Sequence, residues 1–239
     1  MKIMNFEVFT GRLASLDFNH KKVINTLNAH SYIVAKNDET FNRALHDSDI
    51  ILPDGSGIVL AAKNIHKKHI NKIAGTDIHE FILEKMNKRS GKVFYMGSSE
   101  TNLSKIKKKI NREYPNIIVD SYSPPFKTTF TEYENSIIIK KINRFKPDVL
   151  FVGMTAPKQE KWLYENKNNL EYKKVACCIG AVFDFYAETI QRPGIFWRNL
   201  VGESIPRFFQ NPKKMWKRNF ISIPLFIIDM LMYKFKFKK

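Results

Sequence analysis

The sequence predicts an α/β fold, a Rossmann-like parallel sheet flanked by helices, followed by a basic, aromatic, helical appendage. Short apolar runs that end at Gly or Pro alternate with segments of helical spacing, which is typical of a parallel sheet wrapped by helices. After about Arg192 the pattern changes to aromatic residues interleaved with Lys and Arg. We therefore expect an α/β domain over residues 1–192 and a separate appendage over residues 193–239.

Composition supports a globular chain. Its 239 residues are 44% hydrophobic and 26% charged, which is enough apolar material for a full core and argues against extended disorder. Cys177 and Cys178 are adjacent within an apolar run, which favours reduced, buried thiols over a disulfide framework. The N-terminus lacks the long apolar core of a signal peptide, so we expect a cytoplasmic protein.

The expected elements follow in order along the chain. Strands are predicted near 23–28, 50–53, 92–97, 117–119, 148–153 and 174–180. Helices are predicted over 30–45, divided near Asn37 and Asp38, then over 59–62, over 78–82 with Thr76 or Asp77 as N-cap, after Ser99, over 137–145, and from Pro157. Helix surfaces are the expected places of five histidines, His30, His46, His66, His69 and His79.

Polar residues or glycines follow four of the predicted strands. They are Thr26 and Asn28, then Asp54, then 97–99, and then 153–159. Because parallel strands end at one edge of a sheet, these positions together predict a ligand crevice. Taken singly, each also fits a simpler interpretation: Asp-Gly is a common turn, 97–99 can cap a helix, and Lys158 can be a solvated surface residue.

The charge distribution points to a polyanionic partner. The chain has 40 Lys and Arg against 23 Asp and Glu, a net charge of +17, and eleven basic residues against two acidic ones lie from Arg192 onward. Nucleic acid, an anionic membrane and phosphorylated substrates would all suit this charge. No nucleic-acid-reading motif is present, so nucleic acid is not an expected partner.

The end of the chain predicts membrane association. Residues 220–233 are apolar apart from Ser222 and Asp229, but a spanning helix needs about 20 apolar residues. Basic residues beside aromatic ones are typical of a segment that lies in a membrane interface. The alternative is a solvated helix that completes the core, with its lysines supplying solubility.

Several enzyme classes are not indicated. The sequence has neither the His-x-x-x-His nor the Cys-x-x-Cys spacing, and it has no clustered Asp-x-Asp, so we expect no dedicated metal site and no cofactor. It also has no Gly-x-Ser-x-Gly elbow and no Walker loop, which argues against a serine hydrolase and a P-loop enzyme.

Taken together, the motifs resemble the WecG/TagA/CpsF family of bacterial glycosyltransferases, from about Val23 to Phe220. The motifs that carry the resemblance are Thr-Leu-Asn at 26–28, Leu-Pro-Asp-Gly-Ser-Gly-Ile-Val at 52–59, Ala-Gly-Thr-Asp at 74–77, Phe-Tyr-Met-Gly at 94–97, Val-Gly at 152–153 with Pro-Lys-Gln-Glu at 157–160, and Ile-Gly-Ala-Val-Phe-Asp-Phe at 179–185. Members of the family move a sugar from a nucleotide-sugar donor, typically UDP-linked, onto a polyprenyl-diphosphate-linked sugar.

The resemblance implies roles for individual residues. Asp54 matches the general base that deprotonates the acceptor hydroxyl, Thr26 a threonine beside it, and Gln159 a polar contact near the donor. With these, the expected donor-binding residues are Asn28, Gly55, Gly57, Lys72, Gly97, Gly153, Lys158 and Gly180. The expected phosphate, acceptor or membrane contacts are Arg192, Arg207, Lys214, Lys217 and Arg218.

The resemblance therefore implies an inverting, metal-independent transferase of a UDP-linked sugar, such as the N-acetylhexosamine ManNAc, in surface polysaccharide or teichoic-acid-type synthesis. Its expected partners are the UDP-sugar, a polyprenyl-diphosphate-linked acceptor and the anionic inner face of the cell membrane, and it can form a homo-oligomer. The alternative is a non-catalytic protein that binds a nucleotide-sugar or a lipid-linked glycan. The sequence departs from the family pattern at Lys72, Glu188, Pro193, Ser204 and Pro206.

Overall fold

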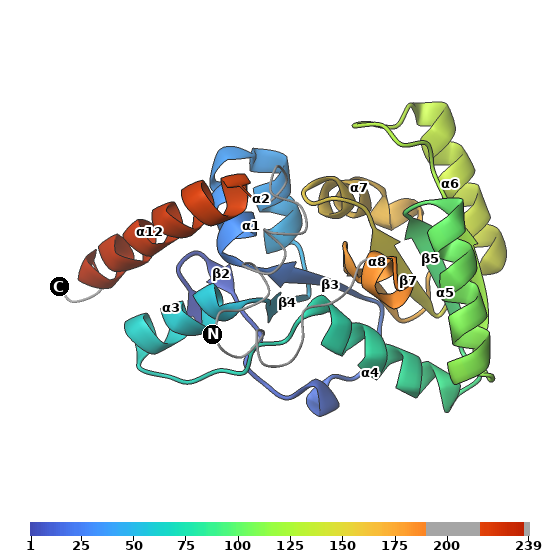
Figure 1. The fold of residues 1–239 in the computed structure, drawn as a ribbon, viewed down its shortest axis with the longest axis horizontal. Helices are drawn as coiled ribbons and strands as arrows, with labels where there is room; N and C mark the ends of the chain where they lie inside the picture. The colour runs from blue at the N-terminus through green and yellow to red at the C-terminus, as the bar shows by residue number, and fades with distance from the viewer. Residues whose placement is uncertain (190–215, 237–239) are drawn as a thin grey trace.

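The predicted strands form a single parallel sheet. In the computed structural model, which describes residues 1–189 and 216–236, the order across this six-stranded sheet is β4-β3-β8-β7-β5-β6 (Figure 1). The strands are β3 (Lys22–Leu27), β4 (Ile50–Pro53), β5 (Lys92–Gly97), β6 (Ile118–Tyr122), β7 (Val149–Gly153) and β8 (Val175–Cys178). The prediction of a Rossmann-like parallel sheet is confirmed.

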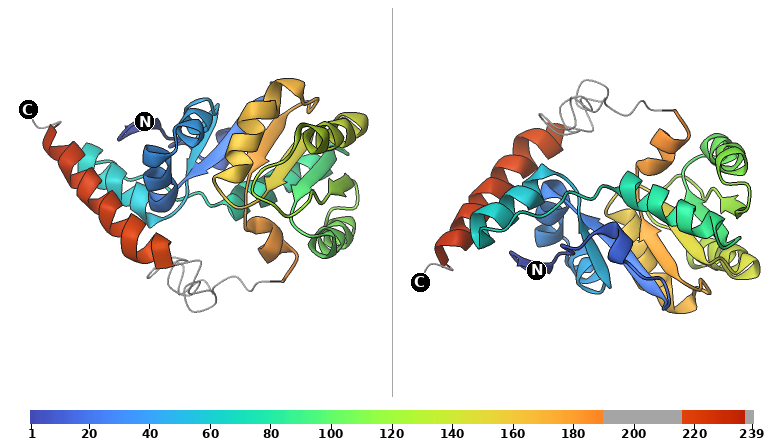
Figure 2. Two further views of the ribbon diagram at one scale, coloured as in Figure 1. Left: turned by 90° about the horizontal axis from the view of Figure 1, so that it is seen from above. Right: turned by 90° about the horizontal axis from the view of Figure 1, so that it is seen from below.

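Helices cover both faces of the sheet (Figure 2). One face packs against α4 (Gly75–Asn87), α5 (Glu100–Glu113) and α8 (Val182–Tyr186), and the other against α6 (Glu132–Phe145) and α7 (Lys158–Asn166). Alternate residues of β7 serve the two layers, since Val149 and Phe151 face the first group while Leu150 and Val152 face the second. This two-sided burial explains the continuous apolar runs of the central strands.

A third cluster of buried residues lies at the β4 end of the sheet. It joins α1 (Ala29–Asn37), α2 (Glu39–His46), α3 (Ser56–His66) and the C-terminal helix. The division between α1 and α2 falls where the sequence predicted it, because the Asp38 carboxylate caps α2 by accepting a hydrogen bond from the Phe41 amide at 2.9 Å.

Three local features differ from the predictions. The N-terminus forms a small antiparallel hairpin, β1 (Lys2–Ile3) with β2 (Phe6–Glu7), which the sequence did not indicate. Helix α4 is capped at Ala74, and Asp77 caps it from the third helical position by accepting from the Ala74 amide at 2.8 Å. Two predictions of histidines on helix surfaces are wrong. His79 is buried in the core, with its Nε2 2.6 Å from the Tyr95 hydroxyl, and His69 lies in the loop after α3.

The C-terminal segment docks onto the α/β body. A π-helical turn, Lys217–Ser222, leads into α12 (Ile223–Lys236), which lies alongside α1 and α3 (Figures 1 and 2). Phe226 of α12 is buried with its ring 5.4 Å from that of Tyr32, and Lys36 pairs with Asp229 at 2.6 Å. The expected boundary at 192/193 lies outside the described residues.

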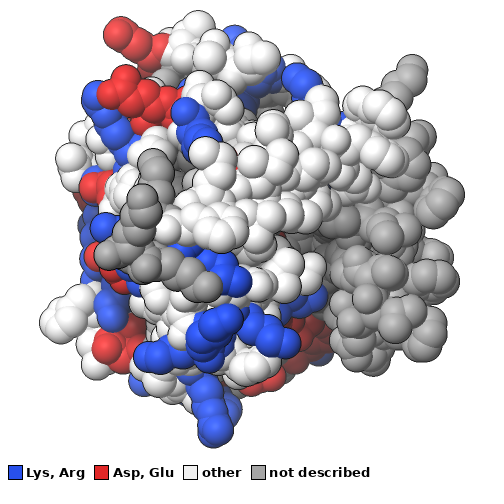
Figure 3. Space-filling view, turned by 90° about the vertical axis from the view of Figure 1, so that its left-hand side faces the viewer, with Lys and Arg blue, Asp and Glu red and all other residues white. Residues whose placement is uncertain are grey.

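The other face of this segment is apolar and exposed. Nine of the thirteen exposed large hydrophobic residues in the described chain belong to it: Trp216, Phe220, Ile221, Leu225, Ile227, Ile228, Leu231, Met232 and Phe235. Seen from the left-hand side of Figure 1, a largely uncharged area is bordered by basic residues with some acidic ones among them (Figure 3). Within residues 1–189 and 216–236, no helix combines the length and the apolarity that a membrane crossing requires.

Candidate active site

The sheet brings the predicted strand ends to one edge. Along the order β4-β3-β8-β7-β5, five neighbouring strands end within two residues of Asp54, Thr26, Gly180, Gly153 and Gly97 respectively. These are the positions at which open α/β sheets bind ligands. The predicted crevice residues that follow different strands therefore share one edge.

Asp54 and Thr26 come from adjacent strands. Thr26 pairs in register with Leu52, and the Asp54 amide donates to the Leu27 carbonyl at 2.9 Å, which extends the β3–β4 ladder past the end of β4. Both residues are partly buried. This ladder fixes the backbone of Asp54 beside the end of β3, so the two predicted catalytic residues are held close by main-chain hydrogen bonds.

A sharp turn after Asp54 opens α3. Gly55 has φ of +98°, a conformation that L side chains rarely adopt, so this position requires glycine. Across the turn, Asn28 caps α1, since its Oδ1 accepts from the amides of His30 and Ser31 at 3.0 Å each. The predicted donor-binding Asn28 thus has its side-chain oxygen committed to the helix start.

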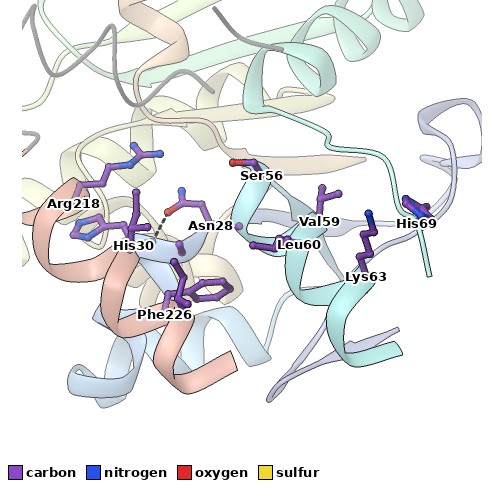
Figure 4. A pocket seen from close by; sticks show the side chains of 14 residues that line it. Asn28, His30, Ser56, Val59, Leu60, Lys63, His69, Arg218 and Phe226 are labelled. Atoms are coloured by element: carbon purple, nitrogen blue, oxygen red, sulfur yellow. Dashed lines mark hydrogen bonds between the residues drawn. The ribbon is translucent and has the colours of Figure 1, made fainter. Parts of the chain in front are cut away.

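A groove of about 470 Å³ lies between α3 and α12 beside this turn (Figure 4). Fourteen residues line it: Asn28, Ala29, His30, Gly55, Ser56, Gly57, Val59, Leu60, Lys63, His69, Arg218, Ile223, Phe226 and Ile227. The groove therefore places Arg218, a predicted phosphate contact, in the same space as Asn28 and Gly55.

His30 links the α/β body to the C-terminal segment at the Arg218 end of the groove. Its Nδ1 lies 2.8 Å from the Ser222 hydroxyl. Burial, and then the charges of Arg218 and Lys217, lower the pKa of His30, so its imidazole is neutral near pH 7. Lys217 itself is exposed.

Gln159 has a different setting from the one predicted for a donor contact. It is buried, its Oε1 accepts from the amides of Met154 at 3.2 Å and Gly180 at 3.0 Å, and its Nε2 donates to Glu160 at 2.8 Å. The side chain therefore ties the loop after β7 to the loop after β8. Lys158 points elsewhere, with its ammonium 3.7 Å from the centre of the Phe130 ring.

Close packing accounts for three of the predicted glycines. A Cβ on Gly97, whose φ is +118°, would lie 2.4 Å from the Gly153 carbonyl oxygen, and one on Gly153 would lie 2.5 Å from the Phe183 ring. A Cβ on Gly57 would lie 3.1 Å from the Cβ of Ala29. Gly97 and Gly153 therefore need glycine for packing whether or not a donor binds nearby, while Gly57 is only closely packed.

Of the remaining residues singled out in the sequence, some lie in the described part of the chain and others lie outside it. Lys72 is partly exposed and lies beside the end of β4, because the next amide, that of Ile73, donates to the Pro53 carbonyl at 3.0 Å. Ser99 caps α5, as the simpler interpretation of 97–99 required. Arg192, Arg207 and Lys214, together with the departures at Pro193, Ser204 and Pro206, lie outside the described residues.

The family comparison decides the class of protein. The sequence model of the family described as "Glycosyl transferase WecG/TagA/CpsF family" matches residues 3–239 of this chain. The chain belongs to this family. It is a glycosyltransferase, so the alternative of a non-catalytic binding protein is set aside.

Curated members of the family are similar over most of the chain. The chain is 31% identical over 209 residues to the N-acetylglucosaminyldiphosphoundecaprenol N-acetyl-beta-D-mannosaminyltransferase of Bacillus subtilis (strain 168). The aligned region covers 87% of this chain and 78% of that protein. It is 28% identical to proteins of the same name from Bacillus spizizenii (strain ATCC 23059 / NRRL B-14472 / W23), over 92% of this chain and 82% of that one, and from Staphylococcus aureus (strain MW2), over 87% and 82%.

Sequence reasoning missed several residues of the groove in this family member. His30, Lys63 and His69 line it, yet none stands in a motif with an obvious chemical signature. His30 acquires its place from Ser222, which is 192 residues away in the chain. Among the described residues, no group of three or more His, Cys, Asp or Glu is arranged to hold a metal ion.

Glu160, next to Gln159 in α7, is also buried. Burial raises the pKa of its carboxyl from 4.5 to about 7, although the hydrogen bond from Gln159 opposes the shift. Its Oε2 has no hydrogen-bond partner within the described part of the chain. Glu160 is therefore a buried titratable group that is hydrogen-bonded to Gln159.

Glu160 should make stability depend on pH. Its folded pKa is raised, so between pH 4.5 and about 7 the folded state binds more protons than the unfolded state, and stability is lost as the pH rises. We expect the free energy of unfolding of the wild type to fall as the pH rises from 5 to 8. The fall should exceed that of Glu160→Gln by on the order of 3 kcal/mol. Denaturant titrations at the two pH values measure this difference. Glu165→Gln, at an exposed position on the same helix, is the control and should behave like the wild type.

Proposed function

We propose that this enzyme transfers an N-acetylhexosamine, such as N-acetylmannosamine, from a UDP-sugar to a sugar carried on a polyprenyl diphosphate. The observation that supports the acceptor most directly is the shared name of the relatives, which specifies N-acetylglucosaminyldiphosphoundecaprenol as the acceptor and mannosaminyl transfer as the reaction. By the same similarity, the product belongs to cell-wall polymer synthesis.

The chemistry assigns Asp54 as the general base. A sugar hydroxyl is a weak nucleophile, and a positioned carboxylate can take its proton as the new bond forms. The acceptor oxygen attacks the anomeric carbon of the donor, the bond from that carbon to the UDP oxygen breaks, and UDP leaves from the opposite face. Direct displacement of this kind inverts the anomeric centre, and Thr26 stands beside the reacting groups.

Backbone amides at a helix N-terminus are proposed to stabilise the departing diphosphate of UDP without a metal. Helix N-termini carry partial positive charge and free amides, and α3 begins at Ser56 directly after Asp54 and Gly55. Charge developing on the leaving group is thus countered by groups already in place.

The C-terminal segment is proposed to hold the enzyme on the inner face of the cell membrane. Six of its nine exposed apolar residues lie on α12, and lysines stand at exposed positions nearby, including Lys63 of α3 and Lys67 and Lys68 directly after it. An apolar helix face buried in the headgroup region, with basic residues around it, is a typical arrangement of a peripheral membrane protein. A lipid-linked acceptor requires this location.

A donor panel tests the proposal. The enzyme is incubated with a synthetic GlcNAc-diphosphate-lipid and a set of UDP-sugars that includes UDP-N-acetylmannosamine, in the presence of a metal chelator, and UDP release is measured. We expect acceptor-dependent release with one donor. Release that needs added metal would contradict metal independence, and silence from folded enzyme across the panel would contradict the proposed donor or acceptor.

A further inference from the structure

The groove between α3 and α12 has chemically distinct parts. Arg218, His30 and Asn28 stand at one end, and Lys63 and His69 stand at the other (Figure 4). Between the two ends the lining is apolar and comes from both helices, through Val59, Leu60, Ile223, Phe226 and Ile227. A nucleotide-sugar would leave this middle part without polar partners, whereas a hydrocarbon chain would match it.

The helical spacing makes the groove a channel that runs along α3. Ser56, Leu60 and Lys63 lie on one face of the helix, at spacings of four and three residues. Seven residues of helix from Ser56 to Lys63 span roughly 10 Å. The channel therefore begins at the turn that carries Asp54 and extends away from it by about two helical turns.

The apolar lips of this channel are open. Leu60 is 43% exposed and Ile227 is 38% exposed, on opposite walls. Contiguous exposed apolar surface is typical of an interaction site, whereas single exposed apolar residues are normal. The channel also adjoins the exposed apolar face of α12, so a chain that leaves it has a path into a membrane.

We propose that this channel binds the isoprenoid chain of the acceptor, with the diphosphate at the Arg218 end and the chain passing Leu60 and Ile227 toward the bilayer. The inference rests on the proposed function, since it assigns a subsite to that acceptor. The cation at the Asp54 end matches the diphosphate in charge, the apolar middle matches the isoprenoid, and Lys63 at the far end suits anionic headgroups.

Binding of farnesyl diphosphate, compared with inorganic diphosphate, tests this assignment without turnover. By calorimetry we expect the wild type to bind farnesyl diphosphate on the order of tenfold more tightly than inorganic diphosphate. Leu60→Gln with Ile227→Gln should abolish that gain and leave the affinity for inorganic diphosphate unchanged. Both positions are partly exposed, so these substitutions are compatible with folding. The control Met232→Gln, on α12 but outside the groove, should keep the gain.

The outcomes separate the channel from the proposed reaction. Equal affinities in the wild type, or a gain that survives the double substitution, would overturn the channel even if the enzyme transfers sugar to a lipid acceptor. A gain that the double substitution removes, in an enzyme that transfers no sugar, would support the channel and contradict the reaction. Loss of the gain in Met232→Gln as well would assign the effect to the whole helix and overturn the channel.

Discussion

Asp54→Asn should lower the turnover number by about 10²- to 10⁴-fold, the usual contribution of a general base. Asn keeps the size of the side chain but cannot accept the proton of the acceptor hydroxyl. The backbone of this position is fixed by the hydrogen bond to Leu27 and by the turn at Gly55, neither of which needs the carboxylate. We therefore expect the thermal unfolding temperature and the affinity for the donor to change little.

UDP release with the lipid acceptor measures this effect, and calorimetric binding of UDP gives the donor affinity. Asp49→Asn is a suitable control, because Asp49 precedes the same strand and its carboxylate accepts from the Val23 amide at 2.7 Å, far from the catalytic edge. Turnover within a few-fold of the wild type in Asp54→Asn would remove this residue from the mechanism. Equal losses in both variants would indicate a structural effect on the strand pair.

Charges on the outer face of α12 should release the enzyme from membranes. Ile228 and Met232 are 52% and 57% exposed and lie on one face of the helix. Each apolar side chain buried in the interface contributes on the order of 1.5 kcal/mol or more. We therefore expect Ile228→Glu with Met232→Glu to weaken binding to anionic vesicles by about a hundredfold or more.

Vesicle sedimentation measures this binding, with Ile118→Glu as the control. Ile118 is 55% exposed on β6, the strand at the opposite edge of the sheet from β4. Its substitution therefore also replaces an exposed apolar side chain with a carboxylate, but far from α12. Retention of the double variant on the vesicles would show that α12 is not the membrane-binding face. Deleting the whole segment is a poorer test, because it would uncover the core around Tyr32 that Phe226 closes.

Much of the fold follows from local patterns in the sequence. The central strands of the sheet are recognisable because their apolar runs are buried on both faces, and the break between α1 and α2 is recognisable because Asp38 offers a cap. The placement of Thr26 and Asp54 at one edge follows from the parallel topology alone. The N-terminal hairpin was not predictable in this way, since strands of two residues carry no period.

The interior polar contacts were beyond the sequence. His79 has the spacing of any helical residue, and only the packing of α4 against β5 shows that it meets Tyr95 in the core. Gln159 could be assigned to the first turn of a helix. The direction of its side chain, toward Met154 and Gly180, depends on how the loops after β7 and β8 pack together. Side-chain direction at such positions is decided by neighbours that are distant in the sequence.

By itself, the sequence determined the α/β class, the shared edge of the predicted site residues and the apolar, basic character of the C-terminus, because these depend on residue type and short-range spacing. Only the tertiary structure decided how that C-terminus is used. Its helix packs one face into the core through Phe226, leaves the other exposed, and joins α3 to form the groove beside Asp54. The physical reason is that such a groove exists only when helices about 160 residues apart pack together, and no local pattern records that contact.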